Sequence, residues 1–207
     1  DATQWFGRLP LSVRDLDADM ITLSSHKIGG PQGAGAVWMK HGVGLDPLIR
    51  GGHQERNRRA GTENTAAIAG FGAAVGAAMQ TLDSERVRQQ SLRDSLWKSI
   101  QGLDVEARCY GIDVERLPNT LNLSLDGLDG ETVLIGLDLA GISISSGSAC
   151  TAGSLDPSHV LLAMGVDHEE ARGAVRFSFG YDSVKKDVDK VIEVLTHLVA
   201  QHRELEP

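Results

Sequence analysis

The sequence LSSHKIGGP, at residues 23–31, is a glycine-rich turn between two short apolar segments. Residues 19–24 (DMITLS) and 35–40 (GAVWMK) flank the turn, and their branched and aromatic side chains favour β-strands. Glycine and proline between two such segments are typical of a tight connection, because glycine adopts backbone angles that other residues avoid. We therefore predict a strand–turn–strand unit whose turn carries Lys27.

The rest of the chain predicts a mixed α/β protein with a domain boundary near residue 83, which gives domains at 1–83 and 84–207. Residues 43–65 are irregular and polar, which is long for a connection without a function. The other predicted elements are, in order, a helix at 64–82 continuing over 83–100 with Val87, Leu92, Leu96 and Ile100 on one face, a strand at 120–125, a helix at 131–140, a strand at 142–145, a helix at 156–164, a strand around Val175, Phe177 and Phe179, and a helix from 183 to about 202.

Composition narrows the classes of function. The 207 residues carry a net charge of −8, which disfavours a nucleic-acid-binding surface, and the arginines at 50–59 form too local a cluster to change this. Two cysteines supply no disulfide framework and fit a reducing cytosol, so we expect a cytoplasmic protein. The longest apolar stretch, residues 66–79, is short and rich in Ala and Gly, and we predict a closely packed core helix rather than a membrane span.

Lys27 is the first candidate for covalent chemistry. A lysine that attacks a carbonyl group needs a lowered pKa and a fixed position, and a tight loop beside a strand end provides both. Ser24 and His26 flank it and can hydrogen-bond an anion, while the glycines allow the backbone to approach a flat ring. The alternative from these residues alone is a solvated lysine in a surface turn.

Cys150 is the second candidate. It lies in a run of small and polar residues, SSGSACTAG at 145–153, which has little to bury and favours an exposed, mobile thiol. Cys109 adjoins Tyr110 after an amphipathic segment, and we predict a structural role for it. The cysteines and histidines show no usual ligand spacing, so we predict no metal site.

Several motifs, in one order, resemble a known family: the cysteine desulfurases that serve iron–sulfur cluster assembly, which are class-V aminotransferases and fold-type I pyridoxal phosphate enzymes. The resemblance covers essentially the whole chain. The matching stretches are Asp1-Ala2-Thr3-Gln4, Ser24-Ser25-His26-Lys27, RRAGTEN at 58–64, LPNT at 117–120, SSGSACT at 145–151 and RFSFG at 176–180. It implies the C-terminal part of the large, cofactor-binding domain followed by a smaller α+β C-terminal domain.

The resemblance also implies a role for each matching residue. Lys27 would hold pyridoxal phosphate covalently and move the substrate Cα proton, and Asp1 would pair with the pyridine nitrogen. Gln4 would bond the phenolic oxygen of the ring, and Ser24 and His26 would hold the phosphate. Thr62 would reach the phosphate of the neighbouring subunit in a homodimer. Arg176 would bind the carboxylate of L-cysteine, and Cys150 would take the sulfur as a persulfide.

The loop before residue 156 resembles the branch of the family whose members pass sulfur directly to scaffold proteins. Members of the family are roughly twice as long as this chain, which implies that it is a C-terminal half, inactive unless completed. It would be an expressed or proteolytic fragment, a split enzyme whose N-terminal half is a separate chain, or part of a longer chain. The competing functions are a selenocysteine lyase, another fold-type I pyridoxal phosphate enzyme, and a non-catalytic sulfur-relay or scaffold-binding fragment.

Overall fold

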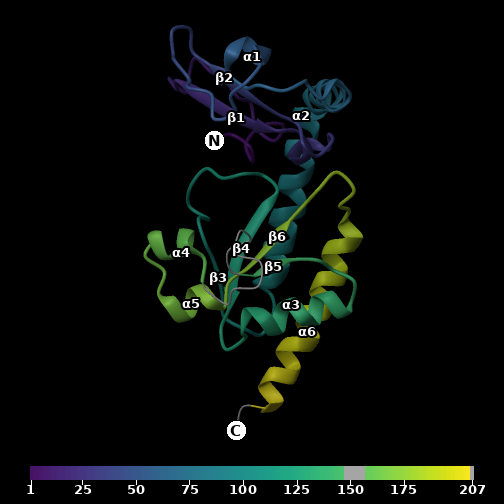
Figure 1. Cartoon of the computed structure of the whole chain (residues 1–207). Helices are drawn as coiled ribbons and strands as arrows, with labels where there is room; N and C mark the ends of the chain where they lie inside the picture. The colour runs from purple at the N-terminus through teal and green to yellow at the C-terminus, as the bar shows by residue number, and fades with distance from the viewer. Residues whose placement is uncertain (147–156, 206–207) are drawn as a thin grey trace. The chain divides into compact units, whose positions relative to one another are not determined.

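The computed structural model describes residues 1–146 and 157–205 of the chain (Figure 1). The chain forms two compact units, Asp1–Ser84 and Glu85–Pro207. Both contain helices and strands, which confirms the predicted mixed α/β class. The assignment of the two parts to a large and a small enzyme domain stays a prediction.

The first unit contains an antiparallel hairpin around the Lys27 turn. Strand β1 (Met20–Ser24) pairs with β2 (Gly35–Met39), which confirms both predicted strands. A short 3₁₀ helix, η1 (Ser25–Ile28), follows β1 directly. The apolar cluster of this unit is small and consists of buried Ile28, Phe71 and Ala78 with partly buried Phe6, Leu23, Ala34, Ala74 and Val75.

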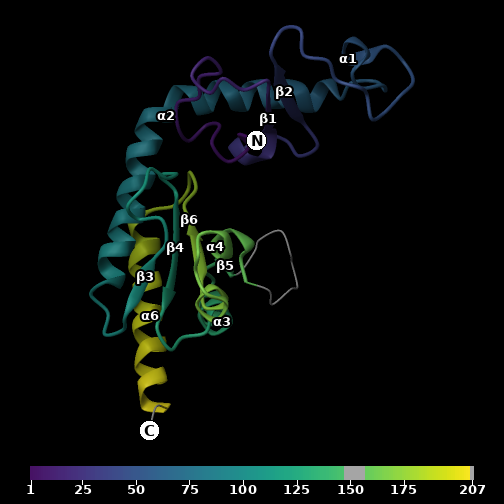
Figure 2. The ribbon, with the colours of Figure 1, turned by 90° about the vertical axis from the view of Figure 1, so that its left-hand side faces the viewer.

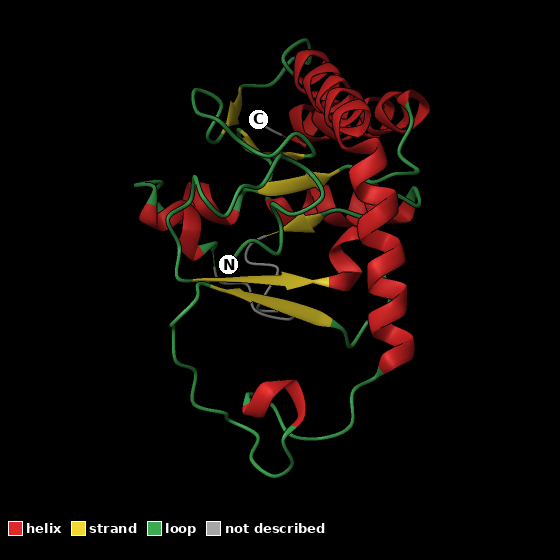
Figure 3. Cartoon of the chain, turned by 90° about the horizontal axis from the view of Figure 1, so that it is seen from above, coloured by secondary structure: helices red, strands yellow, loops and turns green. Residues whose placement is uncertain are grey.

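A long connection, shown in green in Figure 3, leaves β2 and reaches the next long helix through the single turn α1 (Gln54–Asn57). Apart from this turn, the stretch is irregular, as predicted. Glu55, Arg56 and Asn57 have φ angles of 48°, 56° and 64°, in the left-handed region. Left-handed backbone costs a non-glycine residue about 1–2 kcal/mol, so the turn is locally strained.

Helix α2 (Thr65–Ile100) is one continuous helix of 36 residues that runs from the first unit into the second (Figure 2). Leu92, Leu96 and Ile100 lie buried on one face, as predicted. Val87 does not join them and is 63% exposed. It precedes Leu92 by five residues, which places it about 140° away around the helix axis.

The apolar first part of α2 is less buried than predicted. Only one stripe, including Ala67, Phe71 and Ala78, is buried, and Ile68 and Met79 are exposed. The prediction of a closely packed core helix is therefore wrong for this unit by itself, because the hairpin is too small to cover more than one face. By length and hydropathy alone α2 could cross a bilayer, a test that core helices of soluble proteins also pass.

The second unit is built on a four-stranded antiparallel sheet with the strand order β3-β4-β6-β5. Leu121, Leu123 and Leu125 of β4 are buried on one face of the sheet, which confirms the predicted alternation. The strands are β3 (Ala107–Cys109), β4 (Thr120–Leu125), β5 (Ser145–Ser146) and β6 (Val175–Ser178).

Helices cover both faces of this sheet. The second part of α2, α3 (Gly130–Leu139) and α6 (Lys185–Leu205) pack in the main core with β4 and β6. The short helices α4 (His159–Ala163) and α5 (His168–Arg172) lie on the other side of the sheet from α2 and α6 (Figure 2). A second apolar cluster forms there from Tyr110, Leu161, Val166, Ala171 and Ala174.

Two predicted elements of the second unit are shorter than expected. The strand predicted at 142–145 is wrong for Ile142–Ile144, because the N–H of Ile142 donates to Leu137 O (2.9 Å) at the end of α3 instead of to a strand. The helix predicted at 156–164 begins only at His159, and its expected cap Asp156 lies outside the described residues. The helices predicted at 131–140 and from 183 are confirmed as α3 and α6.

Candidate active site

Lys27 lies in η1, where backbone hydrogen bonds fix the chain on both sides. Ser25 N–H donates to Ala34 O, and Gly30 N–H donates to Ser25 O, each at 3.1 Å. Ile28 is buried in the small core, while the neighbouring Lys27 side chain is half-buried. Gly29 ends the turn with a φ of 82°, in the left-handed region. The turn therefore holds Lys27 in a defined place with its side chain still accessible.

Gly30 packs so closely on the turn that an added side chain would force its neighbours to move. A Cβ added there would lie 2.2 Å from Ser25 Oγ and 3.1 Å from Ala74 Cβ. The Ser25 hydroxyl is buried and has no hydrogen-bond partner in the described part of the chain. Gly30 therefore has a packing role within the turn, and the predicted approach of the glycine backbone to a ligand stays a prediction.

Asp1 lies beside β1, the strand that leads into the Lys27 turn. Its Oδ1 accepts hydrogen bonds from Thr3 N–H at 2.8 Å and from the Thr22 hydroxyl at 3.1 Å. Ala2 N–H also donates to Thr22 O at 3.1 Å. The Asp1 carboxylate is thus bound to Thr22, two residues before Ser24, although Asp1 is distant from Lys27 in sequence. Gln4 is exposed in the turn that follows Asp1.

Thr22 is a site residue that sequence interpretation missed. It is exposed on β1, and its hydroxyl orients the Asp1 carboxylate. A threonine at an outward position of a strand gives no functional signal by itself, because threonine is common on strands. Only the pairing of the N-terminal residues with β1 reveals its role.

Ser24 and His26 form a second polar group at the end of β1. Ser24 Oγ and His26 Nδ1 are 2.9 Å apart, within hydrogen-bond distance. His26 is exposed and Ser24 is half-buried, so both remain accessible. A hydroxyl and an imidazole at one strand end can donate hydrogen bonds to an anion such as a phosphate.

The other predicted site residues lie elsewhere. Thr62 is exposed in the connection before α2, and among the described residues no hydrogen bond joins it to the Lys27 turn. Arg176 lies on β6 of the second unit, half-buried on the face opposite Val175 and Phe177, as predicted. Cys150 lies outside the described residues.

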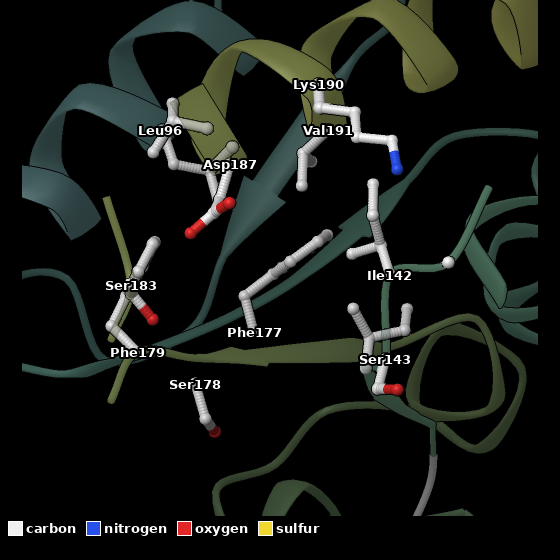
Figure 4. Close-up of a pocket in the computed structure, with 13 residues that line it drawn as sticks. Leu96, Ile142, Ser143, Phe177, Ser178, Phe179, Ser183, Asp187, Lys190 and Val191 are labelled. Carbon is white, nitrogen blue, oxygen red and sulfur yellow. The ribbon is translucent and has the colours of Figure 1, made fainter. Parts of the chain in front are cut away.

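A pocket of about 250 Å³ lies in the second unit, between the segment 142–144, β6 and α6. Figure 4 shows Phe177, Ile142 and Val191 around it, with Lys190 and Asp187 at its margin. None of the predicted site residues that the structure describes lines it. Phe177 points into this space, and Arg176 belongs to the opposite face of the same strand.

The residues at β1 fit pyridoxal phosphate by the chemistry of their functional groups. Lys27 supplies an amine, Asp1 an oriented carboxylate for a protonated ring nitrogen, and Ser24 with His26 donors for a phosphate. All of them lie on or beside one strand and its turn. This part of the site is therefore present in the first unit.

Comparison with known proteins agrees with this chemistry. The family model "Aminotransferase class-V" matches residues 1–191. A cysteine desulfurase from Gluconacetobacter diazotrophicus is 46% identical over the whole chain, which covers 52% of that protein, and the cysteine desulfurase IscS of Clostridium botulinum is 44% identical, with 53% covered. The chain thus spans about half the length of the curated relatives it matches.

A solved structure extends the likeness to the fold. The NifS-like protein from Rickettsia africae superposes with a TM-score of 0.87 at 35% identity over 97% of this chain and 52% of that one. This confirms the predicted fold-type I architecture, whose class-V members depend on pyridoxal phosphate. Because the family model matches nearly the entire sequence, the chain belongs to the class-V aminotransferase family.

Proposed function

We propose that this chain is half of a cysteine desulfurase, which removes sulfur from L-cysteine and leaves L-alanine. The observation that carries the proposal is the arrangement on β1, where the fixed Asp1 carboxylate adjoins the turn with Ser24, His26 and Lys27. The similarity to named cysteine desulfurases over the whole chain favours this reaction over others of the family.

The residues of the first unit would hold the cofactor and move a proton. Lys27 would bind pyridoxal phosphate covalently, Asp1 would keep its ring nitrogen protonated, and Gln4, Ser24 and His26 would hold its oxygen atoms. When bound, this cofactor stabilises negative charge at the substrate Cα. The Lys27 amine would then take the Cα proton, which the half-buried position of its side chain allows.

Arg176 would bind the substrate carboxylate. Arg88, Arg93 and Arg108 in the same unit each form an ion pair with a carboxylate. Among the described residues, the polar partner of Arg176 is instead the neutral Ser145 hydroxyl, at 3.4 Å from Nη2. A guanidinium without an internal counter-ion is suited to bind an external carboxylate in a bidentate manner.

Cys150 would accept the sulfur. Its thiolate would attack the substrate sulfur, so that an S–S bond forms while the carbon–sulfur bond breaks. The electron pair of the broken bond would stay with the carbon, which a proton converts into the methyl group of alanine. The small-residue composition of 145–153 supports an accessible thiol for this step.

The sulfur acceptor would be a scaffold protein for iron–sulfur clusters or another sulfur-carrying protein. The low cysteine content supports a reducing, cytoplasmic location. Thr62, in the exposed and strained connection before α2, would serve the cofactor of a second subunit in a homodimer. The half of the relatives that this chain does not match would complete the site.

The test uses a completed enzyme, made by fusing the N-terminal half of the Gluconacetobacter desulfurase in front of Asp1. With an excess of a thiol reductant such as dithiothreitol, which reduces the Cys150 persulfide, it should convert L-cysteine to alanine and sulfide. Cys150→Ser should abolish this sulfide release while Lys27 still binds the cofactor. Cys109→Ser is the matched control and should remain active. Sulfide release that persists in Cys150→Ser, or full turnover by the 207-residue chain alone, would contradict the proposal.

A further inference from the structure

Arg176 lies in the middle of a row of three polar residues that crosses three strands. In the sheet register it stands directly opposite Asn122 of β4 on one side and Ser145 of β5 on the other. Directly opposite residues point to the same face of a sheet, with Cβ atoms about 4.5–5.5 Å apart. The three side chains therefore share the face opposite the main core.

The Asn122 side chain has an unused acceptor. Its Oδ1 is buried and has no hydrogen-bond partner in the described part of the chain. Asn119, three residues earlier, differs because its Nδ2 donates to Phe179 O at 3.4 Å. A buried carbonyl oxygen without a partner opposes folding, so Asn122 is poorly explained as a purely structural residue.

Among the described residues, most N–H donors of Arg176 have no acceptor. A guanidinium has five N–H donors, and the contact with Ser145 Oγ uses one of them at the long distance of 3.4 Å. No hydrogen bond joins the two side chains in this structure, but the register places them directly opposite each other, so a change of side-chain rotamer can bring the Asn122 oxygen to the guanidinium. Acceptors on both flanks of the guanidinium would fix its plane and leave its remaining N–H groups to an incoming carboxylate.

We propose that Asn122 is a positioning residue, which together with Ser145 orients the Arg176 guanidinium for the substrate carboxylate. The inference rests on the proposed function, in which Arg176 binds L-cysteine. Bidentate recognition needs a fixed guanidinium plane, because a rotated fork makes one hydrogen bond instead of two. Asn122 thus acts on the substrate through Arg176 and not by direct contact.

The kinetic test compares Asn122→Ala with the parent in the completed enzyme. Loss of one orienting hydrogen bond should raise KM for L-cysteine about five- to tenfold and leave kcat nearly unchanged. In an Arg176→Ala background the same substitution should have no further effect on KM. Unchanged KM in Asn122→Ala, or an equal rise in KM in both backgrounds, would overturn the proposal.

A second measurement needs no activity and uses the 207-residue chain itself. In NMR spectra of arginine side chains, Asn122→Ala should shift the Arg176 Nε–H signal. The signal of Arg116, whose guanidinium contacts Cys109 Sγ, should stay in place. An unmoved Arg176 signal would overturn the proposal even if the desulfurase assignment were wrong.

Discussion

The two units support their functional side chains with very different amounts of structure. Lys27 follows β1 of a two-stranded hairpin, whose buried cluster consists of Ile28, Phe71 and Ala78. Arg176 lies on β6, an interior strand of a four-stranded sheet that packs on a core extending from Leu92 to Val199. Isolated two-stranded hairpins are marginally stable, whereas a larger sheet with a covered apolar face is stable by itself.

The difference in core size implies that the two units position their functional side chains in different ways. The second unit would keep Arg176 oriented by its own packing, with a polar neighbour on each side. The first unit fixes the Lys27 turn locally, through backbone hydrogen bonds and the close approach of Gly30, but leaves much of α2 exposed. Local order of the turn therefore does not depend on a large core, whereas the stability of the whole first unit does.

Replacing Lys27 with alanine should have the largest effect. In the completed enzyme it should lower desulfurase turnover by at least about a hundredfold, because proton transfer by a positioned group alone contributes about 10²–10⁴. Lys40→Ala is the matched control, since Lys40 is exposed and pairs with Asp17 at the surface. Turnover is measured as alanine release, and equal losses in the two variants would contradict the role of Lys27.

Substitutions that create a cavity in the core of each unit test the difference in stability between the two units. Leu121→Ala should destabilise the second unit by about 2–5 kcal/mol, because Leu121 is completely buried in the main core. Ile28→Ala should loosen the first unit and leave the second unchanged. Hydrogen exchange of peptides containing β1 and β4 separates the two effects. If both variants accelerated exchange in both strands alike, the units would unfold as one, against this interpretation.

Gly30→Ala tests the local order of the Lys27 turn. The new methyl group would lie 2.2 Å from Ser25 Oγ, so Ser25 must move within its buried site, at a cost of about 1–3 kcal/mol. Because this displaces the turn that holds Lys27, labelling of Lys27 by pyridoxal phosphate should fall in Gly30→Ala. Gly72→Ala is the matched control, because a Cβ there meets nothing within 4 Å and alanine favours a helix. Equal labelling in both variants would refute the role assigned to Gly30.

The smallest expected effect is a pH dependence confined to the second unit. Burial raises the pKa of Tyr110 to about 12 from 10.0. Between these values the unfolded chain loses the proton and the folded chain keeps it, so stability should fall as the pH rises through this range. Urea midpoints at about pH 9 and about pH 11 should therefore differ less in Tyr110→Phe than in the parent. Identical differences would contradict this expectation.

Much of the fold was predictable because its signals are local. The alternation of Leu121, Leu123 and Leu125 and the glycine-rich turn at 23–31 predicted β4 and the first hairpin. Strand β3 and helix α5 were not predicted, because both are short and depend on distant contacts. Arg108 of β3 forms an ion pair with Glu170 of α5 at 2.8 Å, and no local sequence pattern predicts this ion pair.

The candidate site likewise contains residues that local sequence predicts and residues that it does not. Lys27, Ser24 and His26 are neighbours in sequence, and motif order added Asp1 and Arg176 to them. Thr22 and Asn122 were missed because their significance comes from residues far away in the sequence: Thr22 bonds the Asp1 carboxylate, and Asn122 stands opposite Arg176 in the sheet register. Such a partner is set by strand register, which depends on the whole sheet.

The most direct test of the central claim is the position of the cofactor. The completed enzyme is incubated with pyridoxal phosphate, reduced with borohydride and digested, and the modified peptide is identified by mass spectrometry. One adduct on Lys27 is predicted, together with its loss in Lys27→Ala and its retention in Cys150→Ser. An adduct spread over surface lysines, or one that persists after Lys27 is replaced, would contradict the assignment of the β1 turn as the cofactor site.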